Sequence, residues 1–420
     1  MNIVFIPIGS AGDVYPFLGL AQVLARRGHS ITVVTNPKFS ALVEQQGFEF
    51  VPLGTAEDFD RISADPDMWN GFRAFKLIAR WAMLNTMRPI YEEIESRYKP
   101  GETVVVSQVT AFGARLAQEK LGVPLACLHL QPSVFRSFYE TPTLPPMLSG
   151  NGVPRWLKRA QFFLADKLVV DPLVLPELNA FRRELQLPPV SRPMKDWWYS
   201  PQRNIALFPE WFAPRQPDWP ENTVLTGFPN WDPYQDEPLS SDTQKFLSSG
   251  SPPIVWTPGS AVQHAREFFV TAVETCLQLG RRGMLLTRHP DQLPPVLPTG
   301  VQHFDYVPLR TLMPLAAALV HHGGIGTTSQ ALAAGRPQLI MPMAHDQPDN
   351  AARVTRLGVG AAVPVKRFTG PVVSEVLGRL LKDSSVARAC VDVFEKMQHQ
   401  TPLDQAAGEV EALFGSDTAQ

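Results

Sequence analysis

The chain has few cysteines, little net charge and no long apolar run, so it lacks the features that mark disulfide-rich, nucleic-acid-binding and membrane-spanning proteins. Its 420 residues include three cysteines. This odd, widely spaced set supports neither a disulfide framework nor a zinc site, and it fits a reducing compartment. The formal net charge of -2 gives no electrostatic reason to expect a nucleic-acid partner. No apolar run approaches the ~20 residues that span a bilayer. We therefore expect a cytoplasmic protein and leave peripheral contact with a membrane open.

Several ligand-binding motifs are also missing. The sequence has no G-x-x-x-x-G-K-[ST] pattern, which argues against a P-loop nucleotidase. The segments GSAGDVYP (9–16) and HHGGIGTT (321–328) lack the full fingerprint of dinucleotide-binding proteins. Neither glycine-rich turn contains Asp-x-Asp, a motif whose absence argues against a metal-dependent transferase. We expect neither a cofactor nor a resident metal ion.

Strands and helices alternate from the first residues onward. Residues 2–8 form a short apolar run, 16–27 carry apolar side chains at helical spacing, and 31–35 form a further apolar run. The alternation continues through 103–107, 111–121 and 124–130, with further strands expected near 204 and over 223–229. This pattern predicts an α/β fold with a doubly wound parallel sheet.

A second series of strands and helices follows a polar, proline-bearing segment. At this length two domains are the default. We expect two Rossmann-like, doubly wound parallel-sheet domains with a ligand cleft between them. The boundaries place one domain at 1–230, a linker at 231–250, a second domain at 251–398, and a helix and tail at 399–420.

The stretch 319–350 is the most informative part of the sequence. An apolar run leads into His321 and His322, a glycine-rich turn, a run of helix formers and a second apolar run that ends in a polar cluster. We interpret it as strand, turn, helix, strand and polar loop. In a parallel sheet both polar clusters then lie at the carboxyl ends of strands, where ligands bind. A helix N-terminus there suits a phosphate group.

Each candidate residue also has an ordinary structural interpretation. A histidine N–H beside the turn would stabilise a departing diphosphate, but two histidines here could be one buried and one exposed. Thr327 and Thr328 could donate to a phosphate or cap the helix. Asp13 could cap the first helix or act as a general base. Aromatic residues over 57–98 and 131–200 could form helix core or line an apolar cleft.

Taken together, these segments resemble the inverting nucleotide-sugar glycosyltransferases of the GT-B fold, the family of plant secondary-product, macrolide and glycopeptide glycosyltransferases. The resemblance covers both halves of the chain. It is carried by the sequences GSAGDVYPFLGLAQVLARRGHSITVVTNP, GFP, TPGS, DYVPL and, above all, HHGGIGTTSQALAAGRPQLIMPMAHDQPDNAARVTRLGVG over 321–360.

The resemblance implies roles for particular residues. It makes 1–230 the acceptor-binding domain and 251–398 the donor-binding domain, with the last helix returning toward the first domain. It implies that the Tyr306 ring stacks on the nucleotide base and that backbone groups of Val307 contact the edge of the base. Leu309 departs from the plant members, which carry Gln at that position. The implied donor diphosphate site comprises Ser260, His321, Gly323, Gly326 and Thr327, and the implied donor sugar site comprises Asp346 and Gln347.

At Asp13 plant members carry a catalytic histidine with a distant aspartate helper. Here GSAGD, with Ser107 and Gln108 near the helper position, resembles bacterial members in which the aspartate is the base. Within the family the likeness is greatest to the rhamnosyltransferases of rhamnolipid synthesis. That likeness implies a dTDP-L-rhamnose donor and a lipophilic 3-(3-hydroxyalkanoyloxy)alkanoate acceptor. The predicted acceptor-binding residues are Trp69, Phe72, Phe135 and Phe138.

Other interpretations remain open from sequence alone. A UDP-glucose-dependent glucosyltransferase acting on a small hydrophobic natural product or lipid would keep the same mechanism. A nucleotide-sugar epimerase would share the two-domain fold and turn over the donor without an acceptor. A sugar-nucleotide or lipid-binding protein would bind ligand and make no product. The oligomeric state cannot be read from the sequence.

Overall fold

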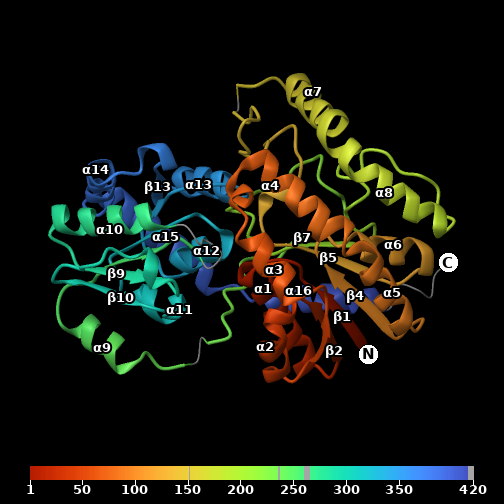
Figure 1. Ribbon diagram of the computed structural model, residues 1–420, viewed down its shortest axis with the longest axis horizontal. Coiled ribbons are helices and arrows are strands. Elements are labelled where there is room, and N and C mark those ends of the chain that lie inside the picture. Colours follow the sequence, from red (N-terminus) through yellow and green to blue (C-terminus); the bar gives the residue numbers. More distant parts are fainter. Residues whose placement is uncertain (151, 235–236, 260–264, 415–420) are drawn as a thin grey trace. The chain divides into compact units, whose positions relative to one another are not determined.

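The computed structural model describes residues 1–150, 152–234, 237–259 and 265–414 and divides into two compact units (Figure 1). The first unit comprises Met1–Pro229 together with Thr401–Gln420, and the second comprises Asn230–Gln400.

The first unit is built on a seven-stranded sheet in the order β3-β2-β1-β4-β5-β6-β7, and every described pair of strands is parallel. Its central strands are almost wholly buried, as expected for a parallel sheet with helices on both faces. The strands are β1 (Asn2–Ile6), β2 (Ser30–Thr35), β3 (Glu49–Pro52), β4 (Thr103–Ser107), β5 (Leu125–His129), β6 (Arg203–Ala206) and β7 (Thr223–Leu225). The helices are α1 (Ala11–Arg26), α2 (Ser40–Gln45), α3 (Ala56–Ser63), α4 (Gly71–Ile78), α5 (Met87–Arg97), α6 (Phe112–Leu121), α7 (Arg155–Ala165), α8 (Asp171–Glu184) and α16 (Pro402–Glu411).

The second unit repeats this architecture with six strands in the order β10-β9-β8-β11-β12-β13, again all parallel. Its strands are β8 (Ile254–Thr257), β9 (Gly283–Leu286), β10 (Val301–Phe304), β11 (Ala318–His321), β12 (Gln338–Ile340) and β13 (Gly360–Ala362). Its helices are α9 (Ser241–Ser248), α10 (Arg266–Leu279), α11 (Leu309–Leu312), α12 (Ile325–Ala333), α13 (Gln347–Arg356), α14 (Gly370–Leu380) and α15 (Ser384–Gln398).

The prediction of two doubly wound parallel sheets is confirmed. Both sheets have the strand order of the Rossmann fold. The order in which strands are added reverses beside the first strand, between β1 and β4 in one sheet and between β8 and β11 in the other. The helix after β1 begins at Ala11, five residues earlier than the apolar spacing indicates. A helix also forms at 347–356, where the sequence suggested a polar loop. Proline near the start of that helix is compatible with its first turn, where a missing N–H costs nothing.

Part of the segment interpreted as a linker belongs to the core of the second unit. Residues 241–248 form α9, capped by the Ser240 hydroxyl, which accepts from the Thr243 N–H. The ring of Phe246 on α9 is buried in the cluster that contains Val255, Met284 and Leu319. One apolar side chain in a polar segment is a weak periodic signal, which is why the sequence suggested a linker here.

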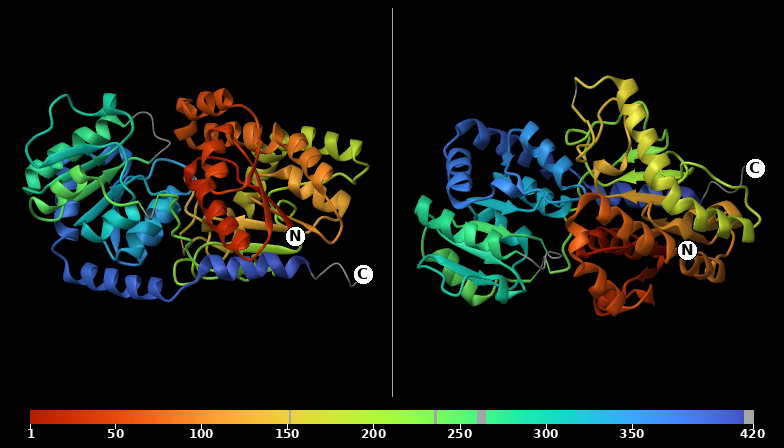
Figure 2. Two further views of the ribbon diagram at one scale, coloured as in Figure 1. Left: turned by 90° about the horizontal axis from the view of Figure 1, so that it is seen from below. Right: turned by 45° about the horizontal axis from the view of Figure 1, so that its top comes forward.

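The helix α16 packs on α1 and β6 of the first unit (Figure 2). Arg27 at the end of α1 donates to Glu411 Oε2 at 2.7 Å and to Asp404 Oδ1 at 2.8 Å. The His29 ring stacks on Phe414, with centroids 5.6 Å apart. These contacts attach the end of the chain to the unit in which the chain begins.

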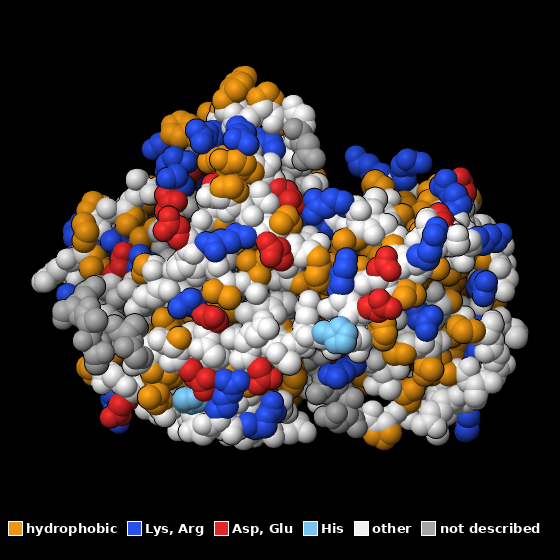
Figure 3. Space-filling model, turned by 180° about the vertical axis from the view of Figure 1, so that it is seen from behind, with side chains coloured by type: hydrophobic (Ala, Val, Ile, Leu, Met, Phe, Trp, Pro, Cys, Tyr) orange, Lys and Arg blue, Asp and Glu red, His pale blue; other side chains and the backbone are white. Residues whose placement is uncertain are grey.

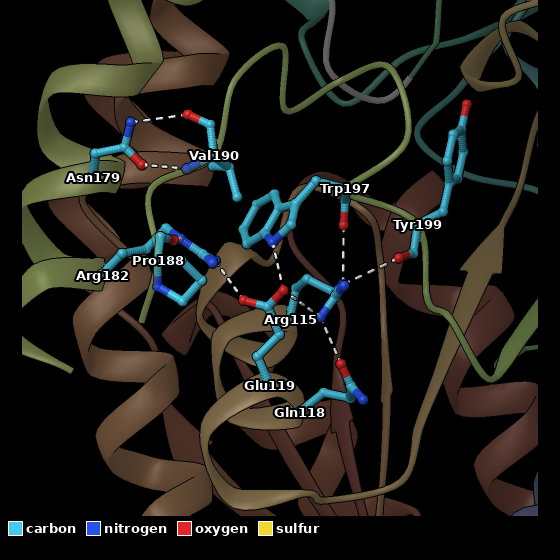
Figure 4. Close-up of polar contacts among 9 residues, drawn as sticks. All are labelled: Arg115, Gln118, Glu119, Asn179, Arg182, Pro188, Val190, Trp197 and Tyr199. Atoms are coloured by element: carbon cyan, nitrogen blue, oxygen red, sulfur yellow. Dashed lines mark hydrogen bonds and ion pairs between the residues drawn. The ribbon is translucent and has the colours of Figure 1, made fainter. Parts of the chain in front are cut away.

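A long insertion between β5 and β6 is fastened to α6 by one carboxylate (Figure 4). Glu119 on α6 accepts from the Trp197 Nε1–H at 3.0 Å and from the Arg182 guanidinium, and it forms an ion pair with Arg115. Arg115 Nε also donates to the Trp197 and Tyr199 carbonyls. Because Glu119 bonds to groups of both α6 and the insertion, the network holds the insertion against α6.

Candidate active site

The two sheets place polar turns at equivalent positions. In the first unit the chain leaves β1 and β4, which are neighbours, at the point where the strand order reverses. In the second unit it leaves β8 and β11 at the corresponding point. Ligands of such sheets bind outside the carboxyl ends of the strands at this reversal. The residues after β1, β4, β8 and β11 are therefore the candidate site residues.

Asp13 lies in the first turn of α1, and its carboxylate is contacted by Ser10, which follows β1, and by Gln108, which follows β4. Its Oδ2 accepts from the Ser10 backbone N–H at 2.8 Å and from the Ser10 hydroxyl at 3.1 Å. Its Oδ1 lies 3.5 Å from Gln108 Nε2, and Gln108 Oε1 in turn accepts from the Ile8 N–H at 3.1 Å. Asp13 therefore does cap α1, as its structural interpretation predicted, and its second oxygen carries only a long contact.

The surroundings of Asp13 suit a base. Burial raises the pKa of Asp13 above its ordinary value of 3.8, and the bonds from Ser10 and Gln108 oppose that shift. A carboxylate with a raised pKa accepts a proton more readily from a reacting hydroxyl.

Gly9 makes this arrangement possible. Its φ of +134° is one that side-chain-bearing residues rarely adopt, and a Cβ there would lie 2.3 Å from Asp13 Oδ2. Glycine is therefore required for the carboxylate to fold back over the turn.

The His321 side chain is fully buried, and both of its ring nitrogens are occupied within the protein. Nε2 is 3.0 Å from Gln338 Oε1, and Nδ1 accepts the Gly323 N–H at 3.1 Å. Burial and, second, the neighbouring His322 lower the pKa of His321 to about 3, although the Gln338 bond opposes the shift, so the ring is neutral. This geometry does not support the predicted contact of the His321 side chain with a diphosphate. His321 is the last residue of β11, a strand that is buried along its whole length.

His322, the first residue after the strand, lies instead between two glycine turns. A Cβ on Gly259 would lie 2.6 Å from His322 Cε1, and one on Gly324 would lie 2.5 Å from Nε2. Its Nδ1 is buried without a hydrogen-bond partner. Burial and, second, the charge of His345 lower the pKa of His322 to about 4. His322 is thus a neutral ring with an unsatisfied nitrogen at the turn, the role the sequence had given to His321.

The N-terminus of α12 supplies donors of another kind. The helix begins at Ile325 after Gly324, Gly326 is exposed, and Thr327 is half-buried. The first N–H groups of an α-helix have no partner within the helix and carry the positive end of its dipole. Gly326 has open space where a side chain would stand, so a ligand can approach this backbone closely. The nine-residue helix therefore offers an anion seat at its start.

The polar loop after β12 is tied to the same glycine turn. Gln347 Oε1 accepts the Met343 and Ala344 N–H groups, and Gly323 approaches Gln347 so closely that a Cβ there would contact its side chain. Asn350, which the sequence analysis missed, donates to Asp346 Oδ2 at 2.7 Å and to the Gly323 carbonyl at 2.9 Å. The i,i+4 spacing of Asp346 and Asn350 would have indicated the pair had a helix been expected there.

The remaining predicted donor residues lie apart from the glycine turn in sequence. The Tyr306 ring is 39% exposed, its hydroxyl donates to Asp232 Oδ2 at 2.8 Å, and the Arg288 guanidinium lies 5.3 Å from its centroid. Val307 is buried in the core of the second unit, so only its backbone is available to a ligand. Ser260 lies outside the described residues.

The predicted acceptor residues whose side chains the structure describes differ in burial. Phe135 is buried in an aromatic cluster, stacked 4.4 Å from Trp219 and 5.7 Å from Tyr199, so it is core rather than ligand-lining. Phe138 is half-buried against Phe162 of α7. Trp69 ends a short 3-10 turn and is half-buried. Phe72 lies on α4, with its side chain outside the described part of the structure. Aromatic content alone does not distinguish core from cleft.

Among the described residues, no group of three or more His, Cys, Asp and Glu side chains is placed to hold a metal ion. In the same part of the chain, no helix combines the length and apolar character needed to cross a membrane.

Comparison with known proteins agrees with this architecture. Residues 3–138 match the glycosyltransferase family 28 N-terminal domain, and residues 285–413 match the erythromycin biosynthesis protein CIII-like C-terminal domain. The chain is 28% identical to O-mycaminosyltylonolide 6-deoxyallosyltransferase of Streptomyces fradiae, over 92% of this chain and 91% of that protein. It is also 28% identical to vancomycin aglycone glucosyltransferase of Amycolatopsis orientalis, over 93% and 92%.

A solved structure shares the fold at lower identity. A spinosyn rhamnosyltransferase complexed with thymidine diphosphate superimposes with a TM-score of 0.68 and 16% identity, covering 98% of this chain and 100% of that one. The chain is therefore a glycosyltransferase of the GT-B fold. It is related to the macrolide and glycopeptide glycosyltransferases, with family 28 and erythromycin CIII-like domains.

Proposed function

We propose that the protein is an inverting glycosyltransferase that needs no metal ion and moves L-rhamnose from dTDP-L-rhamnose to a hydroxyl of a lipophilic acceptor. The proposed acceptor class is a 3-(3-hydroxyalkanoyloxy)alkanoate, the substrate of rhamnolipid synthesis. The observation that carries the catalytic part is the half-buried Asp13 carboxylate, whose pKa is raised and whose Oδ1 has only a long contact.

In this mechanism Asp13 takes the proton of the acceptor hydroxyl. The hydroxyl oxygen attacks the anomeric carbon, the bond from that carbon to the diphosphate breaks, and the configuration at the carbon inverts. The diphosphate leaves with negative charge, and donors fixed in place before the reaction stabilise that charge. We assign those donors to the α12 N–H groups and to His322, because the ring nitrogens of His321 are both occupied.

The donor assignment rests on similarity as well as on residues. A deoxyallosyltransferase is among the relatives, and thymidine diphosphate is bound in the spinosyn rhamnosyltransferase structure. The first supports a deoxysugar and the second supports dTDP as its carrier. Asp346, held by Asn350 beside the glycine turn, is the proposed partner of the sugar hydroxyls, and the exposed Tyr306 ring is the proposed support of the base.

The first experiment is calorimetric titration with dTDP and with UDP, each with and without a chelator. We expect tighter binding of dTDP that the chelator does not weaken. Tighter binding of UDP would favour the alternative, a UDP-glucose-dependent glucosyltransferase, for which the vancomycin aglycone glucosyltransferase is a relative. If neither nucleotide binds, the roles given to 321–350 are wrong.

The second experiment supplies dTDP-L-rhamnose together with hydroxyacyl acceptors of increasing chain length. Mass spectrometry should detect the acceptor carrying one deoxyhexose, and the anomeric NMR signal should show inversion. Donor turnover that does not require an acceptor would support an epimerase instead. Binding without product under all conditions, unaffected by Asp13→Asn, would support a binding protein.

A further inference from the structure

The helix α7 and the π-helical turn η5 (Asp166–Val170) that continues it distribute polar and apolar side chains in an unusual way. The positions that face the protein recur every four residues, at Lys158, Phe162, Asp166 and Val170. Two of these four buried side chains are charged, with Lys158 2% exposed and Asp166 fully buried. Charged side chains are rarely buried unless they are paired, so the inner face is a specific polar arrangement.

The inward charges have their partners in adjacent segments. Asp166 accepts from Arg136 Nη1 at 2.6 Å and from Arg192 Nε at 3.0 Å. Lys158 Nζ donates to the Tyr139 carbonyl at 3.2 Å. These bonds fix the rotation of α7 about its axis, because turning the helix would leave a buried carboxylate and a buried ammonium group unpaired.

With that rotation fixed, large apolar side chains project outward. Trp156 is 69% exposed and Leu168 is 73% exposed, and Phe163 and Leu164 are exposed as well. Leu148 of the preceding loop is also exposed, and the loop is held to α7 by reciprocal bonds between its backbone and the Gln161 side chain. Six of the fourteen exposed large hydrophobic side chains of the described residues fall within 139–168. An apolar concentration of this kind marks an interaction surface.

The exposed charges among these side chains are all of one sign. The helix α7 contains no acidic residue, and Asp166 after it is buried. The Arg155 guanidinium lies 3.9 Å from the Tyr139 ring centroid and Arg159 lies 5.1 Å from that of Phe138. Lys167 is exposed and forms an ion pair with the buried Asp171 carboxylate at 3.6 Å. Figure 3 shows hydrophobic and basic side chains side by side over this region.

We propose that this surface docks the protein on an anionic lipid bilayer. We call it the α7 face and define it as Leu148, Arg155, Trp156, Arg159, Phe163, Leu164, Lys167 and Leu168. Helices that lie in the interface of a bilayer combine Trp, Phe and Leu on one face with Lys and Arg beside them. The apolar side chains would enter the boundary between headgroups and acyl chains, and the cations would meet the lipid phosphates.

Charge favours a bilayer over a second copy of this chain as the occupant. A two-fold interface brings the same patch of each copy together. The cations Arg155, Arg159 and Lys167 of one copy would then lie against the cationic patch of the other, and like charges would repel. An anionic surface complements all three. The inference does not rest on the proposed reaction, although docking would bring a glycosyltransferase to lipophilic acceptors.

The test uses the full chain without donor or acceptor. Vesicles of phosphatidylcholine alone, or of phosphatidylcholine with phosphatidylglycerol, are sedimented with the wild-type protein and three double variants. Two of these change the α7 face, Trp156→Ser with Leu168→Ser and Arg155→Glu with Arg159→Glu. The control, Leu277→Ser with Val296→Ser, removes two equally exposed apolar side chains of the second unit.

We expect the wild type and the control to bind the anionic vesicles and both α7-face variants to lose at least tenfold in partition coefficient. Circular dichroism and thermal midpoints should stay unchanged, because all four substituted side chains are exposed. Absence of wild-type binding, equal loss in the control or equal binding to neutral vesicles would overturn the proposal. A dimer seen by sedimentation velocity and abolished by Trp156→Ser with Leu168→Ser, without vesicle binding, would assign the face to a second copy. A loss of vesicle binding would leave nucleotide titrations unaffected, so this inference and the proposed function fail separately.

Discussion

The turn after β1 and the turn after β11 both lie at the strand-order reversal of their sheets, one on each side of it, and they differ in charge. The first presents the Asp13 carboxylate, held back by Ser10 and Gln108. The second presents the bare N–H groups of α12 and the neutral ring of His322. One turn is suited to take a proton and the other to hold an anion. The fold therefore supplies the position, and a few residues in each turn determine the chemistry.

The largest expected effect comes from removing the charge of the first turn. Asp13→Asn keeps an oxygen that can accept the Ser10 N–H, so the helix cap should persist while the base is lost. We expect turnover to fall by about 10²–10⁴, with dTDP affinity within about twofold of wild type. The matched control is Asp58→Asn, because Asp58 stands three residues after the N-cap Thr55 of α3 as Asp13 stands after Ser10. Unchanged turnover in Asp13→Asn would remove Asp13 from the mechanism.

The next largest effect is on stability, and it distinguishes His321 from His322 in the second turn. His321→Ala leaves Gln338 Oε1 and the Gly323 N–H unpaired in the interior and opens a cavity. Each buried unsatisfied group costs about 1–3 kcal/mol, so urea titration should show the free energy of unfolding falling by at least about 2 kcal/mol. His399→Ala, at the exposed end of α15, should change it little. A stable His321→Ala protein that has lost nucleotide binding would instead restore the ligand role first predicted for His321.

A smaller effect tests His322 as the ligand-facing ring. Its Nδ1 has no partner in the protein, and a hydrogen bond to a charged group contributes about 1.5–3 kcal/mol. We therefore expect His322→Ala to weaken dTDP binding by roughly 10- to 100-fold in calorimetry. Stability should suffer less than in His321→Ala. Equal dTDP affinity in His322→Ala and wild type would place the diphosphate elsewhere.

The smallest effect concerns pH. The Gln108 bond lowers the pKa of Asp13, so Gln108→Ala should raise that pKa further. A base works only when deprotonated, so the acid limb of the kcat/KM profile should move to higher pH, by less than about one unit. Activity well above the limb should stay near that of wild type. Movement of the limb to lower pH would show that Gln108 does not stabilise the carboxylate form.

Several features could be predicted from local sequence because they depend on local properties. Alternating apolar runs and helical spacing predicted both sheets, and the 103–107 strand appears with the same bounds as β4. The turn 9–13 was predicted because glycine and aspartate directly after a buried strand are typical of a turn at the end of that strand. Other features depend on packing between distant segments. Phe135 and Phe138 are similar aromatics three residues apart, and the first is buried by rings from distant segments, among them Trp219 and Tyr199.

Neighbouring residues alone specify two doubly wound parallel sheets with polar turns at strand ends, because strand burial and turn chemistry are properties of short segments. Which of two adjacent histidines lies inside and which faces the turn is settled by tertiary packing. That choice depends on where β11 ends and on Gln338, seventeen residues away, whose side-chain oxygen contacts the His321 ring. Packing also holds the Asp166 carboxylate after α7 inward, because Arg136 and Arg192 from other segments bond to it there.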